Sequence, residues 1–572
     1  MEKIKKLRSF FKNLNIDGYI VPKNDEFFGE YIPKNKDNLK YISNFSGSYG
    51  FALILKTSNY LFVDGRYTQQ AKIQSGKLFN IETIPKSLPN NVLKYKKLKI
   101  GFDPKLHTEK SLSYFFQKTS CKLTSINYNL IDKIWKKREV KKPRKFFILK
   151  NANAGQHFQE KINQLSNLLL KDKINMQFVS ASENIAWLLN IRGEDSEYTP
   201  IPNSYLILNE KKNVTLFCDL KKIDSKINKH LKNIKILDIK YIQLFLHNIK
   251  KKKIQLDINS CSILFKNIIR KNNKIIETQD PVYLLKSIKN KIELKNTFKS
   301  HIFDGAALTK FIFWVKDNFK RKKITEITAQ EKLLKFRKLN KNFKFPSFPT
   351  ISGTGPNGAI IHYKANKKSN RTLTKGDLYL VDSGGQYNFG TTDVTRTISL
   401  DNKNKKIKNI FTRVLKGHIA VANFKIKKNT CGSDIDYVAR KSLKQINLDY
   451  AHGTGHGVGY FLNVHEGPHG ISKGNKIKFK AGMIVSNEPG YYENGKFGIR
   501  IENLVAVEKA NNFLKFENLT MAPIDKSLID KKMLNKEEIN WLNNYHSVVF
   551  KNLKKFMNNK ELVHLKRNCS NI

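Results

Sequence analysis

Apolar positions at the start of the chain recur at helical spacing. Ile4, Leu7, Phe11 and Leu14 lie three or four residues apart in the stretch MEKIKKLRSFFKNLNIDGYIV, which predicts an amphipathic helix. The stretch lacks the continuous apolar core and the cleavage site of a signal peptide, so we expect no export.

Two segments of the first half share an order of apolar runs. YISNFSG at 41–47 precedes FALIL and YLFVDGR, and WLLNIRG at 187–193 precedes SYLIL and TLFCDLK. This correspondence predicts a duplicated α/β domain, with chance similarity between β-rich hairpins as the alternative explanation. The polar, proline-containing stretch REVKKPRK at 138–145 is the predicted linker between the two copies.

The pattern changes after the second copy, which ends near 287–293. Helical periodicity from Ile302 to Trp314 is followed by glycine-rich, strand-like segments from Phe348 to Val507. The stretch EEINWLNNYHSVVFKNLKKFM predicts a further helix packed on this third domain, and the final NCSNI predicts a frayed end. We therefore predict four segments, at 1–144, 145–290, 291–510 and 511–572.

Two aspartates flank a glycine-rich turn in YLVDSGGQYNFGTTDVTRTI, residues 379–398. Residues 379–381 predict a buried strand, the two glycines at 384–385 permit a sharp reversal, and Asp393 lies in an alternating second strand. Antiparallel pairing of the two strands would bring Asp382 and Asp393 close together. Two like charges held that near each other are costly unless a proton or a cation lies between them.

Three further motifs supply potential ligands on constrained backbone: HGTGHGVG (452–459), SNEPGYY (486–492) and FGIRIENL (497–504). The glycines around His452 and His456 disfavour a helix, and hence a helical zinc-binding pair. His456 is the better ligand candidate of the two. Pro489 favours an extended Glu488, and Glu502 alternates with apolar residues in a short strand.

The full set of candidate ligands is four carboxylates and one imidazole: Asp382, Asp393, His456, Glu488 and Glu502. Each alone has an ordinary explanation as a turn, strand-surface or core residue, but the set has no shared ordinary explanation. Four clustered negative charges require compensation of comparable size, which two divalent cations supply. Oxygen-rich ligation with one nitrogen favours Mn²⁺, with Co²⁺, Fe²⁺ or Zn²⁺ as substitutes.

The composition fits a globular protein of several domains. Of the 572 residues, 40% are hydrophobic and 11% aromatic, which argues against general disorder. No run of about 18 apolar residues suggests a membrane span. The five cysteines are scattered, without a CxxC pair, which favours a reducing cytoplasm.

The net charge of +57 would ordinarily suggest a nucleic-acid or anionic-membrane partner. The lysines, however, run through the whole chain, and charge alone gives only nonspecific, salt-sensitive affinity. We therefore expect no specific nucleic-acid partner and no membrane partner. The basic clusters KKPRK (141–145) and KRKK (320–323) are interpreted as solvated faces or linkers.

Together with IIHYKA (360–365) and NVHEGPHGIS (463–472), these motifs resemble the pita-bread metallopeptidases, which include methionine aminopeptidase, prolidase and aminopeptidase P. FSGSYGFALIL, DGRYTQQA, ENIAWLLNIRG and WLNNYH extend the resemblance, over nearly the whole chain, to the long, three-domain cytosolic Xaa-Pro aminopeptidases. The resemblance implies an α/β (α+β) fold: two duplicated creatinase-like domains at 1–144 and 145–290, a pita-bread catalytic domain at 291–510 and a C-terminal helical extension at 511–572.

The family's ligand order Asp, Asp, His, Glu, Glu matches the candidate set. By resemblance, Asp393 and Glu502 bridge two divalent metal ions, and Asp382 completes one site. His456 and Glu488 complete the other. A hydroxide shared by both ions is then the nucleophile, with Glu488 as the proton shuttle toward the leaving nitrogen.

Substrate-side roles follow from the same resemblance. His362, His452 and His465 match histidines placed to hydrogen-bond the peptide and to stabilise the tetrahedral oxyanion. Arg66 matches a position that contacts the peptide, with a structural ion pair as an equal alternative. Arg500, on the same short strand as the last ligand, is counted with the substrate-binding residues.

The implied activity is metal-dependent hydrolysis of the bond between an N-terminal residue and a penultimate proline, by a cytoplasmic homodimer. A prolidase-like dipeptidase is a second interpretation, disfavoured by the duplicated domain and by the HEGPHG motif. A third is a pita-bread domain retained as a peptide or histone binder, for which loss of metal ligands would be the mark. No ligand position is lost in this sequence, and the same test excludes creatinase, which shares the fold without the metals.

Overall fold

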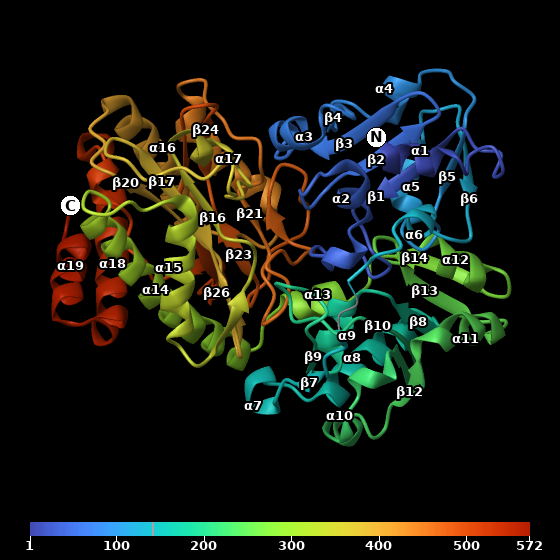
Figure 1. Ribbon diagram of the computed structural model, residues 1–572. Helices are drawn as coiled ribbons and strands as arrows, with labels where there is room; N and C mark the ends of the chain where they lie inside the picture. Colours follow the sequence, from blue (N-terminus) through green and yellow to red (C-terminus); the bar gives the residue numbers. More distant parts are fainter. Residues whose placement is uncertain (140–141) are drawn as a thin grey trace. The chain divides into compact units, whose positions relative to one another are not determined.

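A computed structural model describes residues 1–139 and 142–572 (Figure 1). The chain forms two compact units, one of residues 1–150 and 156–283 and the other of residues 151–155 and 284–572. The predicted linker at 138–145 and the basic cluster at 141–145 include residues 140–141, which lie outside the described residues.

The first unit contains two six-stranded sheets (Figure 1). The strands of one sheet are β1 (Gly18–Pro22), β2 (Phe51–Leu55), β3 (Asn59–Asp64), β4 (Asn80–Ile84), β5 (Lys99–Phe102) and β6 (Lys122–Ser125). Those of the other sheet are β8 (Met176–Val179), β10 (Ser204–Asn209), β11 (Val214–Cys218), β12 (Lys235–Asp238), β13 (Lys253–Asp257) and β14 (Lys274–Thr278).

The two sheets have the same topology. Their strand orders are β4-β3-β2-β1-β5-β6 and β12-β11-β10-β8-β13-β14. Each has an antiparallel meander at its centre, β1-β2-β3 in one and β8-β10-β11 in the other. The flanking strands of each sheet pair parallel. This shared order confirms the duplicated domain and excludes chance similarity of hairpins.

The N-terminal helix α1 (Glu2–Arg8) is shorter than predicted, because residues 9–15 continue as turns. Ile4, Leu7 and Phe11 are nevertheless all buried in one core. The other helices of the first copy are α2 (Asn38–Ser43), α3 (Thr68–Ser75), α4 (Pro89–Leu93), α5 (Glu109–Phe116) and α6 (Leu130–Ile134). The second copy has α8 (Phe158–Lys171), α9 (Ser182–Leu188), α10 (Ser225–His230), α11 (Ile242–Asn248) and α12 (Ile263–Arg270), with β7 (Phe147–Ile148) paired to β9 (Ile191–Arg192).

The second unit is built on small antiparallel sheets. Its strands are β15 (Phe343–Pro346), β16 (Ile351–Thr354), β17 (Leu378–Ser383), β18 (Gly385–Tyr387), β19 (Gly390–Thr391), β20 (Val394–Ser399), β21 (Gly455–His456), β22 (Gly470–Ile471), β23 (Ile484–Asn487), β24 (Gly490–Glu493), β25 (Phe497–Arg500), β26 (Asn503–Ala510) and β27 (Phe513–Asn518). They form the sheets β15-β18-β19, β16-β17-β20, β23-β26-β27, β21-β22 and β24-β25.

The long helix α14 (Lys291–Asn318) contains the predicted helical stretch from Ile302 to Trp314. It begins with a capping box, in which Asn290 and Glu293 each accept a hydrogen bond from the backbone of the other. Further helices of the unit are α15 (Glu326–Lys338), α16 (Lys405–Ala422) and α17 (Gly432–Lys444). No helix in the described part of the chain is both long enough and apolar enough to cross a membrane.

The C-terminal segment forms two helices where the sequence predicted one, α18 (Lys536–Leu553) and α19 (Asn559–Cys569) (Figure 1). Leu565 and Cys569, one helical turn apart on α19, are buried in the main core of the unit. The Ile572 N–H donates to Asn543 Oδ1 at 3.0 Å. The expectation of a frayed end was therefore wrong, because the last helix anchors the terminus.

Arg396 on β20 is a buried cation that joins several segments of the second unit. Its Nη1 donates to the Glu502 carbonyl at 2.6 Å, and its Nη2 donates to the Ala522 carbonyl at 2.8 Å. Nη2 also lies 2.8 Å from the Asn503 side-chain oxygen and 2.8 Å from the Tyr545 hydroxyl. One guanidinium thus connects β20 to the start of β26, to the segment before α18 and to α18 itself.

We predict that Arg396→Lys destabilises the second unit by about 3 kcal/mol. The single ammonium group of a lysine cannot donate to all the oxygen atoms that the planar guanidinium group of Arg396 reaches. Denaturant unfolding followed by tryptophan fluorescence measures the loss. The exposed Arg321 offers a matched control, and Arg321→Lys should change the free energy of unfolding by less than about 0.5 kcal/mol. Equal stability of the two variants would contradict this role of Arg396.

Candidate metal centre

Asp382 and Asp393 are brought together by the antiparallel pairing of β17 with β20, as the sequence predicted. Asp382 lies opposite Thr395 in this pairing, Asp393 directly precedes β20, and both aspartates are buried. The connection between them is longer than a single reversal, because β18 and β19 form a hairpin within it. Gly384 is required there, since a Cβ at that position would lie 1.9 Å from the Thr392 carbonyl oxygen.

His456, Glu488 and Glu502 come from the other strands of the unit. His456 ends β21, Glu488 follows β23, and Glu502 lies between β25 and β26. The Ser486 hydroxyl accepts from the His456 N–H at 2.9 Å and donates to Glu488 Oε1 at 3.0 Å. The Thr395 hydroxyl donates to Glu502 Oε2 at 2.7 Å. Strand backbone and neighbouring hydroxyls therefore orient these side chains.

The structure gathers the candidate ligands into one cluster. Ligand atoms of Asp393, His456 and Glu502 all lie within 4.8 Å of one another. Nε2 of His456 is 3.5 Å from Asp393 Oδ2 and 3.4 Å from Glu488 Oε1. The charge of Asp382 acts on Asp393, Glu488 and Glu502. Five residues from four sequence motifs thus form one site.

Burial and mutual repulsion shift the ionisation of this cluster. Burial, reinforced by the charge of Asp382, raises the pKa of Asp393 to about 6. Burial, reinforced by the charges of Asp393 and Asp382, raises the pKa of Glu502 well above its usual value, and burial also raises the pKa of Glu488. Burial alone would lower the pKa of His456, but the neighbouring carboxylates raise it to about 9. These carboxylates are therefore fully ionised at neutral pH only when positive charge lies nearby.

The surroundings of the Asp382 carboxylate indicate whether the cluster suits a cation. Oδ2 accepts from Arg500 Nη2 at 2.6 Å, whereas Oδ1 is buried without a hydrogen-bond partner among the described residues. A buried carboxylate oxygen left without a donor costs free energy unless a ligand meets it. The unpaired oxygen, the raised pKa values and the oxygen-rich donor set all fit divalent cations.

Arg500 links the ligand cluster to the predicted substrate histidine His452. Its Nη1 donates to the Tyr492 hydroxyl at 2.6 Å, and that hydroxyl lies 2.8 Å from His452 Nε2. Its Nε lies 3.1 Å from the Thr395 hydroxyl, which in turn donates to Glu502. The Arg500 side chain is only 2% exposed. These contacts suit a positioning role for Arg500, and the substrate contact expected from the sequence stays a prediction.

The other substrate-side histidines lie on two loops. His465 is exposed, and its ring packs edge-on against the ring of His456 with the centroids 4.3 Å apart. His362 is half-buried after the 3-10 helix η4 (Gly355–Ala359). The adjacent Tyr363 hydroxyl donates to the buried Glu326 at 2.8 Å, which fixes this loop. His465 and His452 thus contact groups of the cluster or its network, and the role of His362 stays a prediction.

Arg66 belongs to the first unit. It lies just after β3, where its Nη2 pairs with Asp64 Oδ2 at 2.6 Å. One of the two alternatives drawn from the sequence, a structural ion pair, therefore has a defined partner. A contact between Arg66 and a peptide stays a prediction.

Two residues that contact the ligands or the adjoining Arg500 network were not singled out from the sequence. Ser486 lies two residues before Glu488, and strand alternation could have indicated it, because residues i and i+2 share a face. Tyr492 offers no comparable signal. Its position depends on the pairing of β24 with β25, in which it lies opposite Gly498.

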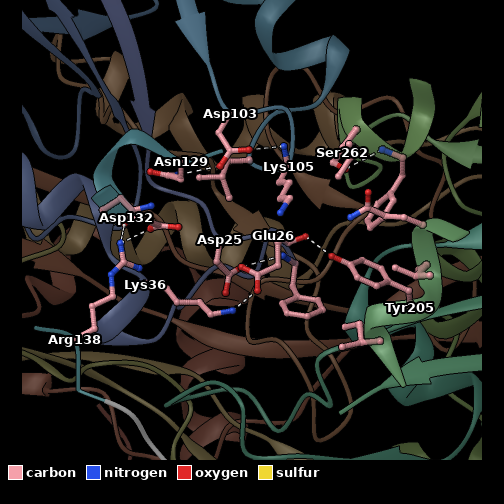
Figure 2. Close-up of a pocket in the computed structure, with 18 residues that line it drawn as sticks. Asp25, Glu26, Lys36, Asp103, Lys105, Asn129, Asp132, Arg138, Tyr205 and Ser262 are labelled. Atoms are coloured by element: carbon pink, nitrogen blue, oxygen red, sulfur yellow. Dashed lines mark hydrogen bonds and ion pairs between the residues drawn. The ribbon is translucent and has the colours of Figure 1, made fainter. Parts of the chain in front are cut away.

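A cavity of ≈ 380 Å³ in the first unit is a separate feature (Figure 2). Burial raises the pKa of Asp25 at its wall to about 6. Two ion pairs lie in the lining, Lys36 with Glu26 and Arg138 with Asp132 (Figure 2). The described lining contains no histidine or cysteine. The cavity therefore lacks an imidazole ligand like that of the cluster in the second unit.

Family models match the chain in four consecutive segments. The Creatinase/Prolidase N-terminal domain matches residues 3–134 and again residues 137–293. Metallopeptidase family M24 matches residues 296–509, and the C-terminal region of peptidase M24 matches residues 512–572.

Similar proteins cover the whole chain. A probable Xaa-Pro aminopeptidase P of Laccaria bicolor is 39% identical over 603 residues, which cover 100% of this chain and 93% of that relative. Xaa-Pro aminopeptidase 1 of Dictyostelium discoideum is 39% identical, and the similarity covers 96% of this chain and 92% of that relative. X-prolyl aminopeptidase from Caenorhabditis elegans, a cytosolic enzyme with a di-nuclear active site, matches with a TM-score of 0.95 and 32% identity over 100% of this chain and 99% of that chain. These similarities confirm the predicted fold class.

We predict that divalent metal stabilises the second unit and that Asp393→Asn removes most of this effect. A ligand at a hundredfold excess over its Kd adds about 2.7 kcal/mol to the free energy of unfolding, and metal bound here also relieves carboxylate repulsion. Calorimetry of chelated protein, with and without added Mn²⁺, measures the shift. The exposed Glu537 on α18 gives a control, and Glu537→Gln should keep the full effect. An undiminished shift in Asp393→Asn would contradict the assignment.

Proposed function

This chain belongs to metallopeptidase family M24 and, within it, to the Xaa-Pro aminopeptidases, and we propose that it removes an N-terminal residue that precedes proline. The substrate is a peptide with a penultimate proline, and the reaction is hydrolysis of the bond between the first residue and that proline. One observation carries the proposal: the ligand cluster of the second unit, in which Asp382, Asp393 and Glu502 are buried and His456 and Glu488 are half-buried.

The proposed cofactors are two divalent metal ions per chain, with Mn²⁺ as the native ion. Asp393 and Glu502 would be shared between the ions and Asp382 would complete one position, with its unpaired Oδ1 available for it. His456 and Glu488 would complete the other position. When bound, such ions lower the pKa of water and polarise a carbonyl group. The oxygen-rich donor set supports Mn²⁺ over a thiolate-selected metal.

Glu488 is the proposed proton carrier of the reaction. Its pKa is raised by burial, so that it accepts a proton nearer to neutral pH than an exposed glutamate does. The Ser486 hydroxyl holds its Oε1 at 3.0 Å, which fixes the carboxylate while the proton moves. The proton that Glu488 takes from water goes to the proline nitrogen as the peptide bond breaks.

His465 is the proposed donor to the peptide carbonyl. It is exposed and packs beside His456. His452 has both ring nitrogens near protein groups, with Nδ1 2.7 Å from the Gly453 carbonyl and Nε2 2.8 Å from the Tyr492 hydroxyl. To bind peptide, His452 must exchange one of these bonds. We propose that His362 and Arg66 bind the peptide as well, and that Arg500 orients the site through Asp382.

Selectivity for proline follows from the chemistry of its nitrogen. A bond to proline has no N–H, and the ring fixes φ near −65°, so a selective site can use shape and apolar contact in place of a hydrogen bond to the amide. We propose that the apolar segment 458–462, which lies between His456 and His465 in the sequence, backs the pocket for such a ring.

The other interpretations have less support. A peptide or histone binder without catalysis would be expected to have lost ligands, whereas all five ligand residues are present in this sequence and three of them, Asp393, His456 and Glu502, cluster in the structure. A prolidase-like dipeptidase is disfavoured because the full-length similarity is to Xaa-Pro aminopeptidases.

We propose domain limits at 1–144, 145–290, 291–510 and 511–572. We further propose a cytoplasmic homodimer with no specific nucleic-acid partner and no membrane partner. The Caenorhabditis elegans relative is a cytosolic enzyme, which supports the proposed cytoplasmic location.

Xaa-Pro-Yaa tripeptides should be cleaved between Xaa and Pro, and matched Xaa-Ala-Yaa peptides far more slowly. We expect His465→Ala to lower kcat by a factor of about 10² to 10³ with a smaller effect on KM, because it removes a donor to the developing oxyanion. Steady-state kinetics with added Mn²⁺ measure both effects. Exposed His247 on α11 provides the matched control, and His247→Ala should leave kcat unchanged. Equal rates on the two peptides would refute the Xaa-Pro assignment.

Light scattering at working concentration should give twice the chain mass of 66.3 kDa. The expectation rests on family membership. A mass near that of a single chain would contradict the homodimer.

A further inference from the structure

Three charged side chains outside the ligand cluster form a buried ion-pair network in the second unit. Nζ of Lys286 lies 2.7 Å from Glu466 Oε2, and Nζ of Lys289 lies 2.6 Å from Glu466 Oε1. Each of the three side chains is at most 1% exposed. The reaction proposed above uses none of them.

Stability alone is a weak reason for such a network. Transfer of each ion out of water costs several kcal/mol, and apolar replacement of buried ion pairs is often neutral or stabilising. Burial on its own would raise the pKa of Glu466, but the charges of Lys286 and Lys289 outweigh burial and lower it. Glu466 is therefore an ionised carboxylate held in the protein interior.

The network is connected directly to the predicted catalytic loop. Glu466 is the residue after His465, and its N–H donates to the Gly457 carbonyl at 2.8 Å, one residue after His456. A Cβ at Gly457 would lie 2.1 Å from the Glu466 carbonyl oxygen, and one at Gly459 would lie 2.8 Å from Glu466 Oε2. The glycines of the HGVG stretch thus let Glu466 pack against the backbone that carries His456.

The two lysines of the network lie close to the backbone that leads to a ligand strand. Lys286 lies on α13 (Val282–Ser287), and Lys289 follows it just before α14. Nζ of Lys289 also donates to the Lys286 carbonyl at 2.9 Å, and its N–H donates to the Gly482 carbonyl at 2.9 Å. Gly482 precedes β23, the strand that leads to Glu488. The two lysines are therefore fixed by backbone near a ligand strand.

We propose that Lys286, Lys289 and Glu466 hold the loop bearing His465 beside His456, which makes Glu466 a positioning residue for the peptidase reaction. The catalytic part of this inference rests on the proposed function, whereas the restraint on the loop does not. Once the network is broken, the His465 ring loses its fixed orientation. A donor displaced from the transition state lowers kcat more than it raises KM.

A double-mutant cycle tests the coupling. We expect Glu466→Gln to lower kcat on an Xaa-Pro-Yaa peptide by about tenfold or more, with KM changed by less than about threefold. The double variant Glu466→Gln/His465→Ala should be no slower than His465→Ala alone, because both changes disable the same group. Losses that multiply in the double variant would overturn the inference.

Amide hydrogen exchange tests the restraint without substrate or metal. In Glu466→Gln we expect faster exchange across residues 457–469 and unchanged exchange in α16. Unchanged exchange across 457–469 would overturn the inference. Faster exchange in a protein whose wild type does not cleave Xaa-Pro peptides would contradict the proposed function and leave the restraint in place.

A charge-free variant separates positioning from folding. Lys286→Met/Lys289→Met/Glu466→Leu leaves no buried ion unpaired, so we expect it to unfold near the wild-type midpoint and to bind metal, but to lose kcat as Glu466→Gln does. Wild-type kcat in this variant would overturn the inference. The control is Lys416→Met, which breaks the 2.6 Å ion pair with Glu538 between α16 and α18 and should keep kcat within about twofold.

Discussion

Repulsion between buried carboxylates is the constraint on which the second unit depends. The pairing of β17 with β20 and of β23 with β26 holds like charges together that would otherwise separate. Arg500 offsets part of the repulsion, since it pairs with Asp382 and reaches Glu502 through the Thr395 hydroxyl. Cations supply the remainder in the function proposed here. The sheets, the arginine and the metal chemistry are therefore parts of one electrostatic balance.

One face of strand β20 contacts residues of the candidate metal site, and the other face contacts the core of the unit. Thr395 and Thr397 alternate on the site face, where their hydroxyls bond Glu502 and the Arg500 backbone. Arg396 points the opposite way and bonds carbonyl groups of the C-terminal part of the unit. Arg396 and Arg500 thus have different roles, because Arg500 pairs with a carboxylate ligand whereas Arg396 fixes the strand that carries the two threonines.

The sequence predicted the features that rest on local signals. Strand periodicity and glycine-rich turns were enough to place Asp382 near Asp393, and repeated apolar runs were enough to predict the duplicated domain. The contact of Lys286 with Glu466 was beyond such reasoning, because its partners are 180 residues apart and nothing marks these lysines among the 105 basic residues of the chain. The lengths of α1 and of the C-terminal helices depended on tertiary packing, which the sequence pattern does not contain.

The burial of Lys286 and Lys289 also matters for the chemical handling of this protein. Reductive methylation, a common aid to crystallisation, modifies lysines that reagents can reach, and this chain exposes a large number of them. Both lysines of the ion-pair network are shielded from solvent, with their side chains at most 1% exposed. Methylation can therefore modify the exposed lysines while the contacts of both buried Nζ groups with Glu466 stay intact.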